Sequence, residues 1–251
     1  MIKTLIAANW KMNTNFDEAK QLINGLLSST NLEAQVETLV CPPFVYLQTI
    51  SNMLEDKPIK LGAQNMYFEE KGAYTGEISP SMVAEFCDYV IIGHSERRQL
   101  FGDTNAIVNR KLISAISYDL TPILCVGENL LDRENGDAEN VVGQQLEESL
   151  GGIAQTANLI VAYEPVWAIG TGMAATSDLA EDIMKFIRLK LASIYDDLFA
   201  NNLTLLYGGS VTSDNVKDYL GQIDINGALV GGASLDAQKF KDIIDKAGEI
   251  D

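Results

Sequence analysis

The chain has 251 residues, and the 47% that are hydrophobic are enough for one large core in a single domain. Acidic residues (35) outnumber basic ones (18), and the resulting net charge of -17 argues against nucleic acid or an anionic membrane surface as a partner. No run of apolar residues is long enough to predict a membrane-spanning helix.

Short apolar runs alternate with segments of helical periodicity along the whole chain. The runs are bounded by turn residues and predict eight strands, over residues 4–10, 38–41, 59–63, 89–93, 122–126, 159–163, 203–207 and 228–230. Apolar residues three and four positions apart predict helices over 16–27, 106–118, 141–150, 179–198 and 237–247. This alternation favours parallel strands joined by helical crossovers.

Eight such units without a linker predict an α/β fold with one domain over residues 1–251, a single (β/α)8 TIM barrel. The periodicity alone does not exclude a doubly wound open sheet. Polar residues favour the barrel, because they cluster directly after the strands. A barrel brings all these positions to one rim, whereas an open sheet would hold the first and sixth strands apart.

The first strand ends in Asn9-Trp10-Lys11. A solvated lysine is the default for this residue type. An amide and a cation at the end of an apolar strand are, however, well placed to stabilise a bound oxyanion. If the ligand of this acidic protein is negative, its site needs such a cation.

His94 is the only histidine, and it stands between the fourth strand and a helix that Ser95 is expected to open. A lone histidine is usually structural or exposed, but this one lies at the rim. The N-terminus of a helix disfavours positive charge on the ring, so we expect a neutral imidazole that exchanges hydrogen bonds with a ligand.

Glu164 ends the sixth strand, and Pro165, Gly170 and Gly172 follow it. The strand holds the carboxylate rigidly, and the glycines allow the next backbone segment to approach an anion or to swing. Taken alone, Glu164 fits a surface salt bridge; in this company it predicts a proton-transferring group beneath a lid. The glycines of this loop lack the third member of a dinucleotide turn.

Two Gly-Gly pairs, Gly208-Gly209 and Gly231-Gly232, end the last two strands. Either pair alone fits a simple turn. At adjacent strands of a barrel, bare backbone N–H groups are typical of a phosphate site, and Ser210 adds a hydroxyl there.

The cysteines, Cys41, Cys87 and Cys125, are odd in number and form no C-x-x-C pair. They predict reduced, buried thiols in a cytoplasmic protein. The chain also begins with a predicted strand and shows no secretory leader.

Several segments resemble the triosephosphate isomerase family, and they occur in the family's order from end to end of the chain. They are residues 8–13 (ANWKMN), 61–65 (LGAQN), 76–79 (GEIS), 93–98 (GHSERR), 125–128 (CVGE), 162–172 (AYEPVWAIGTG), 207–211 (YGGSV) and 231–234 (GGAS).

The resemblance implies interconversion of dihydroxyacetone phosphate and D-glyceraldehyde 3-phosphate, in glycolysis and gluconeogenesis, without metal or organic cofactor. It implies that Glu164 is the base, that His94 and Asn9 polarise the carbonyl, and that Lys11 stabilises the enediolate. Glu96 matches a position beside this cluster, with a role that the resemblance leaves open. The residues implied in phosphate binding, besides Asn9 and Lys11, are Gly170, Ser210, Gly231 and Gly232.

The resemblance also implies a homodimer. The connection over residues 65–79 is rich in aromatic residues, and in the family it inserts into a neighbouring subunit, which would place Thr75 at the contact. An internally packed Ω-loop is the alternative. The chain departs from the family in the lid segment after Gly172. Met173-Ala174 stands there, where the family commonly has a lysine and a branched or hydroxylated residue.

Two other functions fit parts of the pattern. A sugar-phosphate epimerase on a barrel would share the Gly-Gly phosphate site, but it would ordinarily need metal ligands that one histidine cannot supply. A phosphate-binding or adhesion protein without catalysis would not need Lys11, His94 and Glu164 together.

Overall fold

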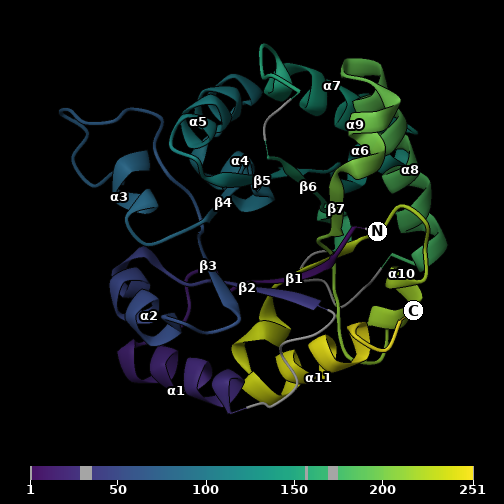
Figure 1. Cartoon of the computed structure of the whole chain (residues 1–251). Coiled ribbons are helices and arrows are strands. Elements are labelled where there is room, and N and C mark those ends of the chain that lie inside the picture. The colour runs from purple at the N-terminus through teal and green to yellow at the C-terminus, as the bar shows by residue number, and fades with distance from the viewer. Residues whose placement is uncertain (1, 29–35, 156–157, 169–174, 251) are drawn as a thin grey trace.

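The computed structural model describes residues 2–28, 36–155, 158–168 and 175–250, and its strands form a closed parallel barrel (Figure 1). Each strand pairs with the next in the chain, and β8 pairs with β1. The predicted barrel is therefore confirmed, and the open sheet is wrong. The strands are β1 (Thr4–Asn9), β2 (Val36–Cys41), β3 (Ile59–Ala63), β4 (Tyr89–Ile92), β5 (Thr121–Val126), β6 (Ile160–Tyr163), β7 (Thr204–Tyr207) and β8 (Gly227–Val230).

Helices cover the outside of the barrel (Figure 1). They are α1 (Phe16–Leu27), α2 (Leu47–Leu54), α3 (Pro80–Ala84), α4 (Ser95–Phe101), α5 (Asn105–Ser117), α6 (Leu130–Glu134), α7 (Ala138–Leu150), α8 (Ser177–Ile194), α9 (Asp197–Asn202), α10 (Val216–Leu220) and α11 (Ala237–Ala247). Three short 3-10 turns complete the described part of the chain, η1 (Phe44–Tyr46), η2 (Val166–Ala168) and η3 (Gly232–Leu235).

The barrel interior is filled by alternate residues of the strands, because successive side chains of a strand point to opposite faces. The buried interior cluster contains Leu5, Ala7, Leu39, Cys41, Ile91, Ile123, Cys125, Ile160, Ala162, Leu206 and Leu229. The intervening residues, such as Ile6, Ala8 and Val161, join a larger core between strands and helices. Continuing the interior rows by two residues leads to Asn9 on β1 and Glu164 after β6. Strand alternation thus aims both polar side chains at the carboxyl end of the barrel.

The helix predicted over 179–198 is in fact two helices. α8 ends at Ile194, and α9 begins after Asp196, whose side chain accepts a hydrogen bond from the Phe199 N–H at 2.7 Å. The apolar spacing continues across the break, so periodicity alone joins the two segments. The capping aspartate is the local signal that separates them.

The three cysteines are free and buried, as predicted. Among the described residues, no helix has the length and apolarity that crossing a membrane requires.

Candidate active site

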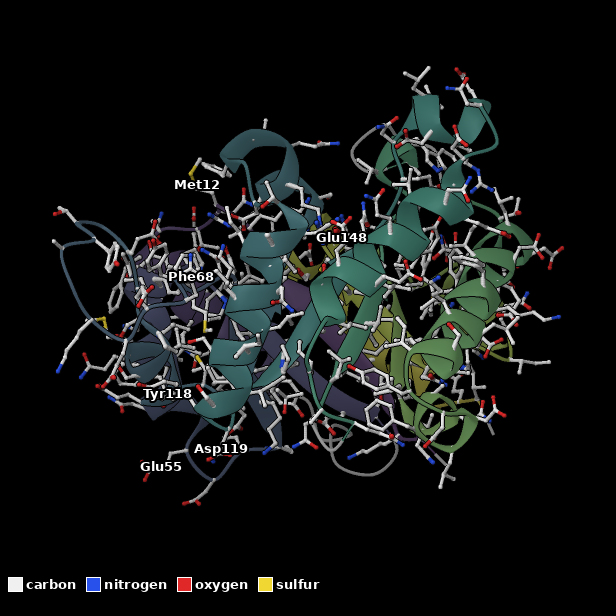
Figure 2. The ribbon with its side chains drawn as sticks, turned by 90° about the horizontal axis from the view of Figure 1, so that it is seen from above. Met12, Glu55, Phe68, Tyr118, Asp119 and Glu148 are labelled. Atoms are coloured by element: carbon white, nitrogen blue, oxygen red, sulfur yellow. The ribbon has the colours of Figure 1, made fainter. Side chains whose placement is uncertain are left out.

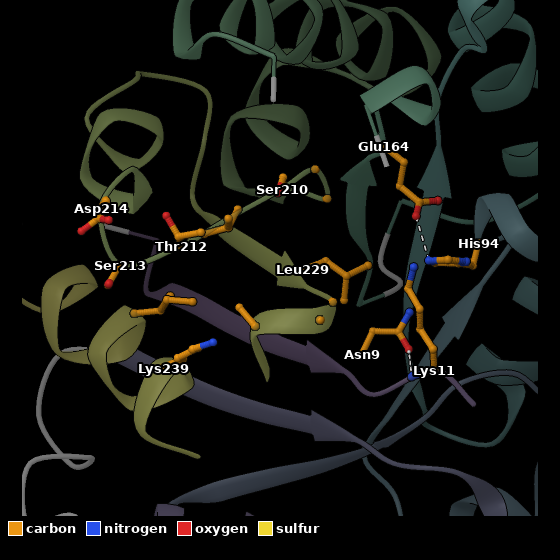
Figure 3. A pocket seen from close by; sticks show the side chains of 17 residues that line it. Asn9, Lys11, His94, Glu164, Ser210, Thr212, Ser213, Asp214, Leu229 and Lys239 are labelled. Carbon is orange, nitrogen blue, oxygen red and sulfur yellow. Dashed lines mark hydrogen bonds and ion pairs between the residues drawn. The ribbon is translucent and has the colours of Figure 1, made fainter. Parts of the chain in front are cut away.

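A pocket of about 610 Å³ opens at the carboxyl end of the barrel (Figure 3). Four of the residues that the sequence predicts to act chemically line it: Asn9, Lys11, His94 and Glu164. Three of the four predicted phosphate-site residues line it too: Ser210, Gly231 and Gly232. Gly170 lies outside the described residues, as does Met173-Ala174.

Glu164 is 2% exposed, and its carboxylate is held by β4 and α4 across the barrel. The Ser95 N–H donates to Oε2 at 2.8 Å, and the Ser95 hydroxyl lies 3.3 Å from Oε1. His94 Nε2 is 2.9 Å from Oε1. These three contacts orient the carboxylate, and Glu164 also lines the pocket.

His94 is the N-cap residue of α4, and its ring is also 6% exposed. The Glu96 N–H donates to Nδ1 at 3.2 Å, which requires an unprotonated Nδ1. A neutral ring that accepts this hydrogen bond carries its proton on Nε2, the nitrogen that faces Glu164. The neutral imidazole that the position before a helix predicts stays a prediction, because the neighbouring Glu164 carboxylate raises the pKa of the ring.

The close contact between Glu164 and His94 shifts the pKa of both groups. Burial raises the pKa of Glu164, but the charge of His94 and the hydrogen bonds from His94 and Ser95 outweigh it and hold the pKa below its usual range. Burial lowers the pKa of His94, but the neighbouring Glu164 carboxylate outweighs it and raises the pKa above its ordinary value. Glu164 is consequently ionised at neutral pH, as a general base must be.

Replacing Glu164 with glutamine should lower the pKa of His94 below the ordinary value of about 6.5. The carboxylate that raises this pKa is then gone, whereas burial and Lys11, which both lower it, remain. Because the chain contains one histidine, an NMR titration of the imidazole nitrogens gives an unambiguous readout. Glu96→Gln serves as the control and should lower this pKa by less, since Glu96 is a smaller cause. An unchanged pKa in Glu164→Gln would show that the pair is not coupled.

Lys11 follows β1 with a backbone φ of 54°, in the left-handed region that non-glycine residues rarely adopt. Two contacts hold this conformation: the Lys11 N–H donates to Asn9 Oδ1 at 3.0 Å, and Gln64 donates to the Lys11 carbonyl at 2.9 Å. Nζ lies 2.8 Å from Glu96 Oε1. The strained turn sends the ammonium group into the pocket, with Asn9 beside it (Figure 3). The sequence left the role of Glu96 open; in the structure it contacts the ammonium of Lys11.

The Gly-Gly pairs lie opposite this cluster. A side chain at Gly231 would come within 3.5 Å of Lys11 Cε, so the bare backbone lies close to the cation. Ser210 is exposed at the end of the turn that begins with Gly208 and Gly209. A Cβ on Gly208 would come within 3.0 Å of the Glu164 side chain. Cation, carboxylate and bare backbone thus share one small volume.

Glu128, which the sequence left without a role, supports the chain just after Glu164. Its carboxylate is fully buried, and Oε1 accepts from Trp167 Nε1 at 2.8 Å, from the Tyr163 hydroxyl at 3.0 Å and from Arg133 at 3.1 Å. Its carbonyl also accepts the Val166 N–H. The partners come from two segments, α6 and the stretch from Tyr163 to Trp167, and no local sequence pattern brings both to Glu128. Strand order was the available signal, since β5 and β6 are neighbours.

Thr75 does not lie in the pocket. It belongs to the exposed tip of the connection between β3 and α3, which projects from the barrel (Figure 1). The base of this connection packs on itself, because Tyr67 stacks on Phe68 with ring centroids 4.1 Å apart and Arg110 lies over Phe68. Tyr74, next to Thr75, also packs on Tyr67, with ring centroids 4.7 Å apart. The loop is therefore packed internally while Thr75 itself is exposed, and both the Ω-loop and the dimer contact stay open.

No group of three or more His, Cys, Asp or Glu side chains is arranged to hold a metal ion within the described ranges. What the pocket offers is a buried carboxylate, a neutral imidazole and an ammonium group around one space. Such a set can take a proton from carbon, donate a hydrogen bond to oxygen, and stabilise the negative charge that results.

The family model and the related proteins that match this chain all belong to one family. The family model of triosephosphate isomerase matches residues 4–247. A protein of that name from Dictyoglomus turgidum is 47% identical over 247 residues, which cover 97% of this chain and 99% of the relative. Another, from Clostridium tetani, is 49% identical, with 96% of each chain covered. A third, from Dehalococcoides mccartyi, is 48% identical over 250 residues, 100% of this chain and 98% of the relative.

Proposed function

Because the chain belongs to the triosephosphate isomerase family, we propose that the pocket at the carboxyl end of its barrel is the active site and that Glu164, His94, Lys11 and Asn9 act there. The enzyme is an isomerase that interconverts dihydroxyacetone phosphate and D-glyceraldehyde 3-phosphate, a step of glycolysis. The observation that carries the assignment is the convergence of these four side chains on one space (Figure 3).

In the proposed reaction the Glu164 carboxylate removes a proton from C1 of dihydroxyacetone phosphate. The electron pair of the C–H bond moves onto the carbonyl oxygen at C2 and produces an enediolate. His94 Nε2–H and the Asn9 amide donate hydrogen bonds to the oxygens, and the ammonium of Lys11 offsets their negative charge. A proton then moves from the C1 hydroxyl to the C2 oxygen, carried by His94 Nε2, and Glu164 returns its own proton to C2. The C1 oxygen is left as the aldehyde and the C2 oxygen as a hydroxyl. The 2.9 Å contact between Glu164 and His94 supports this arrangement, since a substrate entering there meets both groups.

Entry of the substrate also favours a neutral His94. The carboxylate of Glu164 is the cause that raises the pKa of this ring, and a substrate between the two groups weakens that contact. The Glu96 N–H, by contrast, stays bonded to Nδ1 and stabilises the neutral form. A neutral ring can donate from Nε2 without becoming a charged partner of the enediolate.

The phosphate is proposed to bind to the backbone at Ser210, Gly231 and Gly232, at the other end of the pocket. Gly170 is a further proposed donor, on the strength of its motif. Closing the site against water matters because an exposed enediolate can lose its phosphate. Isomerisation coupled to a dehydrogenase tests the whole assignment: a protein that binds phosphate without turning over either triose phosphate would contradict it.

We propose that residues 1–251 act as one catalytic domain.

We further propose a cytoplasmic homodimer in which Thr75 contacts the partner subunit. Met12 is 96% exposed and lies on the side from which the Thr75 loop projects (Figure 2). Met12 directly follows Lys11, so a partner packed on it would support the strained turn. The free, buried cysteines fit a reducing compartment.

Replacing Thr75 with arginine should weaken the dimer about tenfold to a hundredfold, because a charge buried at the contact without a partner costs free energy. Sedimentation velocity across a range of concentrations measures this change, and Thr75→Ser is the matched control. A wild-type protein that is monomeric and fully active at micromolar concentration would contradict the proposal.

A further inference from the structure

The pocket continues beyond the space that a three-carbon substrate needs. Its volume, about 610 Å³, is in the range of pockets that hold much larger ligands. The additional part runs from Ser210 along Thr212, Ser213 and Asp214 to Lys239 and Ile243. These residues come from the β7–α10 connection and from α11, and none of them belongs to the predicted site except Ser210.

Lys239 stands out in this part because of its charge and its position. It is exposed on α11, and its side chain lies at the end of the pocket where Thr212 and Ser213 are also drawn, away from Glu164 and His94 (Figure 3). Ile243 lies four residues further on the same helix face and lines the pocket too. The buried neighbour Phe240 fixes α11 against the core. Among the described residues no ion pair or hydrogen bond of the Lys239 ammonium is present, whereas Lys11 is paired with Glu96.

The charges of the side chains that line the pocket indicate a function for Lys239. Two lysines, Lys11 and Lys239, line it together with two carboxylates, Glu164 and Asp214. These four side chains together carry no net charge, in a protein whose net charge is -17. Without Lys239 the lining would be negative, and it would repel a substrate that carries a phosphate dianion.

We propose that Lys239 is a second cation for the phosphate of the substrate, which attracts it into the pocket from the solvent side. This inference rests on the proposed phosphate site at Ser210, Gly231 and Gly232. Lys11 acts at the reacting carbons, where its charge is needed in the transition state. Lys239 acts at the entrance, so it changes capture of the substrate and leaves the chemical step alone.

The test compares Lys239→Gln with Lys241→Gln. Both variants lose one positive charge from α11, but Lys241, two residues on, does not line the pocket. Lys239→Gln should lower kcat/KM for D-glyceraldehyde 3-phosphate about threefold to tenfold at low ionic strength, with kcat unchanged. Lys239→Glu should lower it further, and the difference from wild type should shrink as salt screens the charge. Lys241→Gln should stay close to wild type.

A second substrate separates attraction of phosphate from a general effect on the pocket. D-glyceraldehyde lacks the phosphate, so its slow turnover should be the same in Lys239→Gln and wild type. Equal losses for Lys239→Gln and Lys241→Gln, or an equal loss with both substrates, would overturn the inference. If Lys11→Met abolishes turnover while Lys239→Gln has no effect, only the role of Lys239 is wrong; if Lys11→Met is also active, the proposed active site itself fails.

Discussion

Replacing Glu164 with alanine should lower kcat by about 10³- to 10⁴-fold, near the upper end of what a general base contributes. No other carboxylate among the described residues is placed to take over: Asp214 lines the far end of the pocket, Glu96 contacts Lys11, and Glu128 is fully buried (Figure 3). The fold should survive, since the substitution removes a desolvated charge and leaves the Ser95 N–H facing an open pocket. The coupled isomerisation assay measures the loss, and thermal unfolding checks the fold.

Glu164→Asp is the matched control. It keeps the carboxylate but withdraws it by one methylene, so the base no longer reaches the hydrogen at its present position. A loss smaller than that of Glu164→Ala is expected, because proton transfer depends steeply on distance and alignment. Inhibition by inorganic phosphate should be similar in wild type and both variants, since the phosphate end of the pocket is untouched. Near-normal turnover of Glu164→Ala would remove the proposed base.

The placement of Glu164 and Asn9 could be predicted from the sequence for a simple reason. Both continue a row of inward-facing residues, Ile160 and Ala162 for Glu164, and Leu5 and Ala7 for Asn9. The period of a strand therefore determines which side chains point along the barrel axis at the rim. Once eight strands are expected to close, these two residues must face each other across a shared space.

Other parts of the site depend on contacts that no local pattern contains. The positive φ of Lys11 is maintained by Gln64, which lies 53 positions away in the sequence and also donates to the carbonyl of Cys41. Lys239 lies in the first turn of α11, outside the nearest motif, and only the orientation of this helix places it at the pocket. The sequence therefore predicts well which side chains lie at the strand ends. It predicts poorly which side chains of the helices reach the same site.

Replacing Lys11 with methionine should lower kcat about 10²- to 10³-fold, the effect of removing one group that stabilises a developing oxyanion. KM should rise as well, because the pocket loses one of its two lysines and the remaining charge of the lining becomes negative. Methionine keeps an unbranched stem of similar length, so packing against Gly231 is preserved. Lys11→Arg keeps the charge and should retain more activity than Lys11→Met, although the larger guanidinium has to fit beside His94.

Lys11→Gly distinguishes the ammonium from the turn that carries it. Non-glycine residues in this backbone region cost about 1 to 3 kcal/mol, whereas glycine adopts it freely. The variant should be as inactive as Lys11→Met in the coupled assay, yet no less stable in denaturant unfolding, because relief of strain offsets the greater freedom of its unfolded chain. Such a result would mean that the fold maintains an unfavourable backbone conformation in order to hold a cation against the substrate. A Lys11→Gly protein that is much less stable than Lys11→Met would instead mean that the lysine stem supports the barrel rim, and the strain would then need no functional reason.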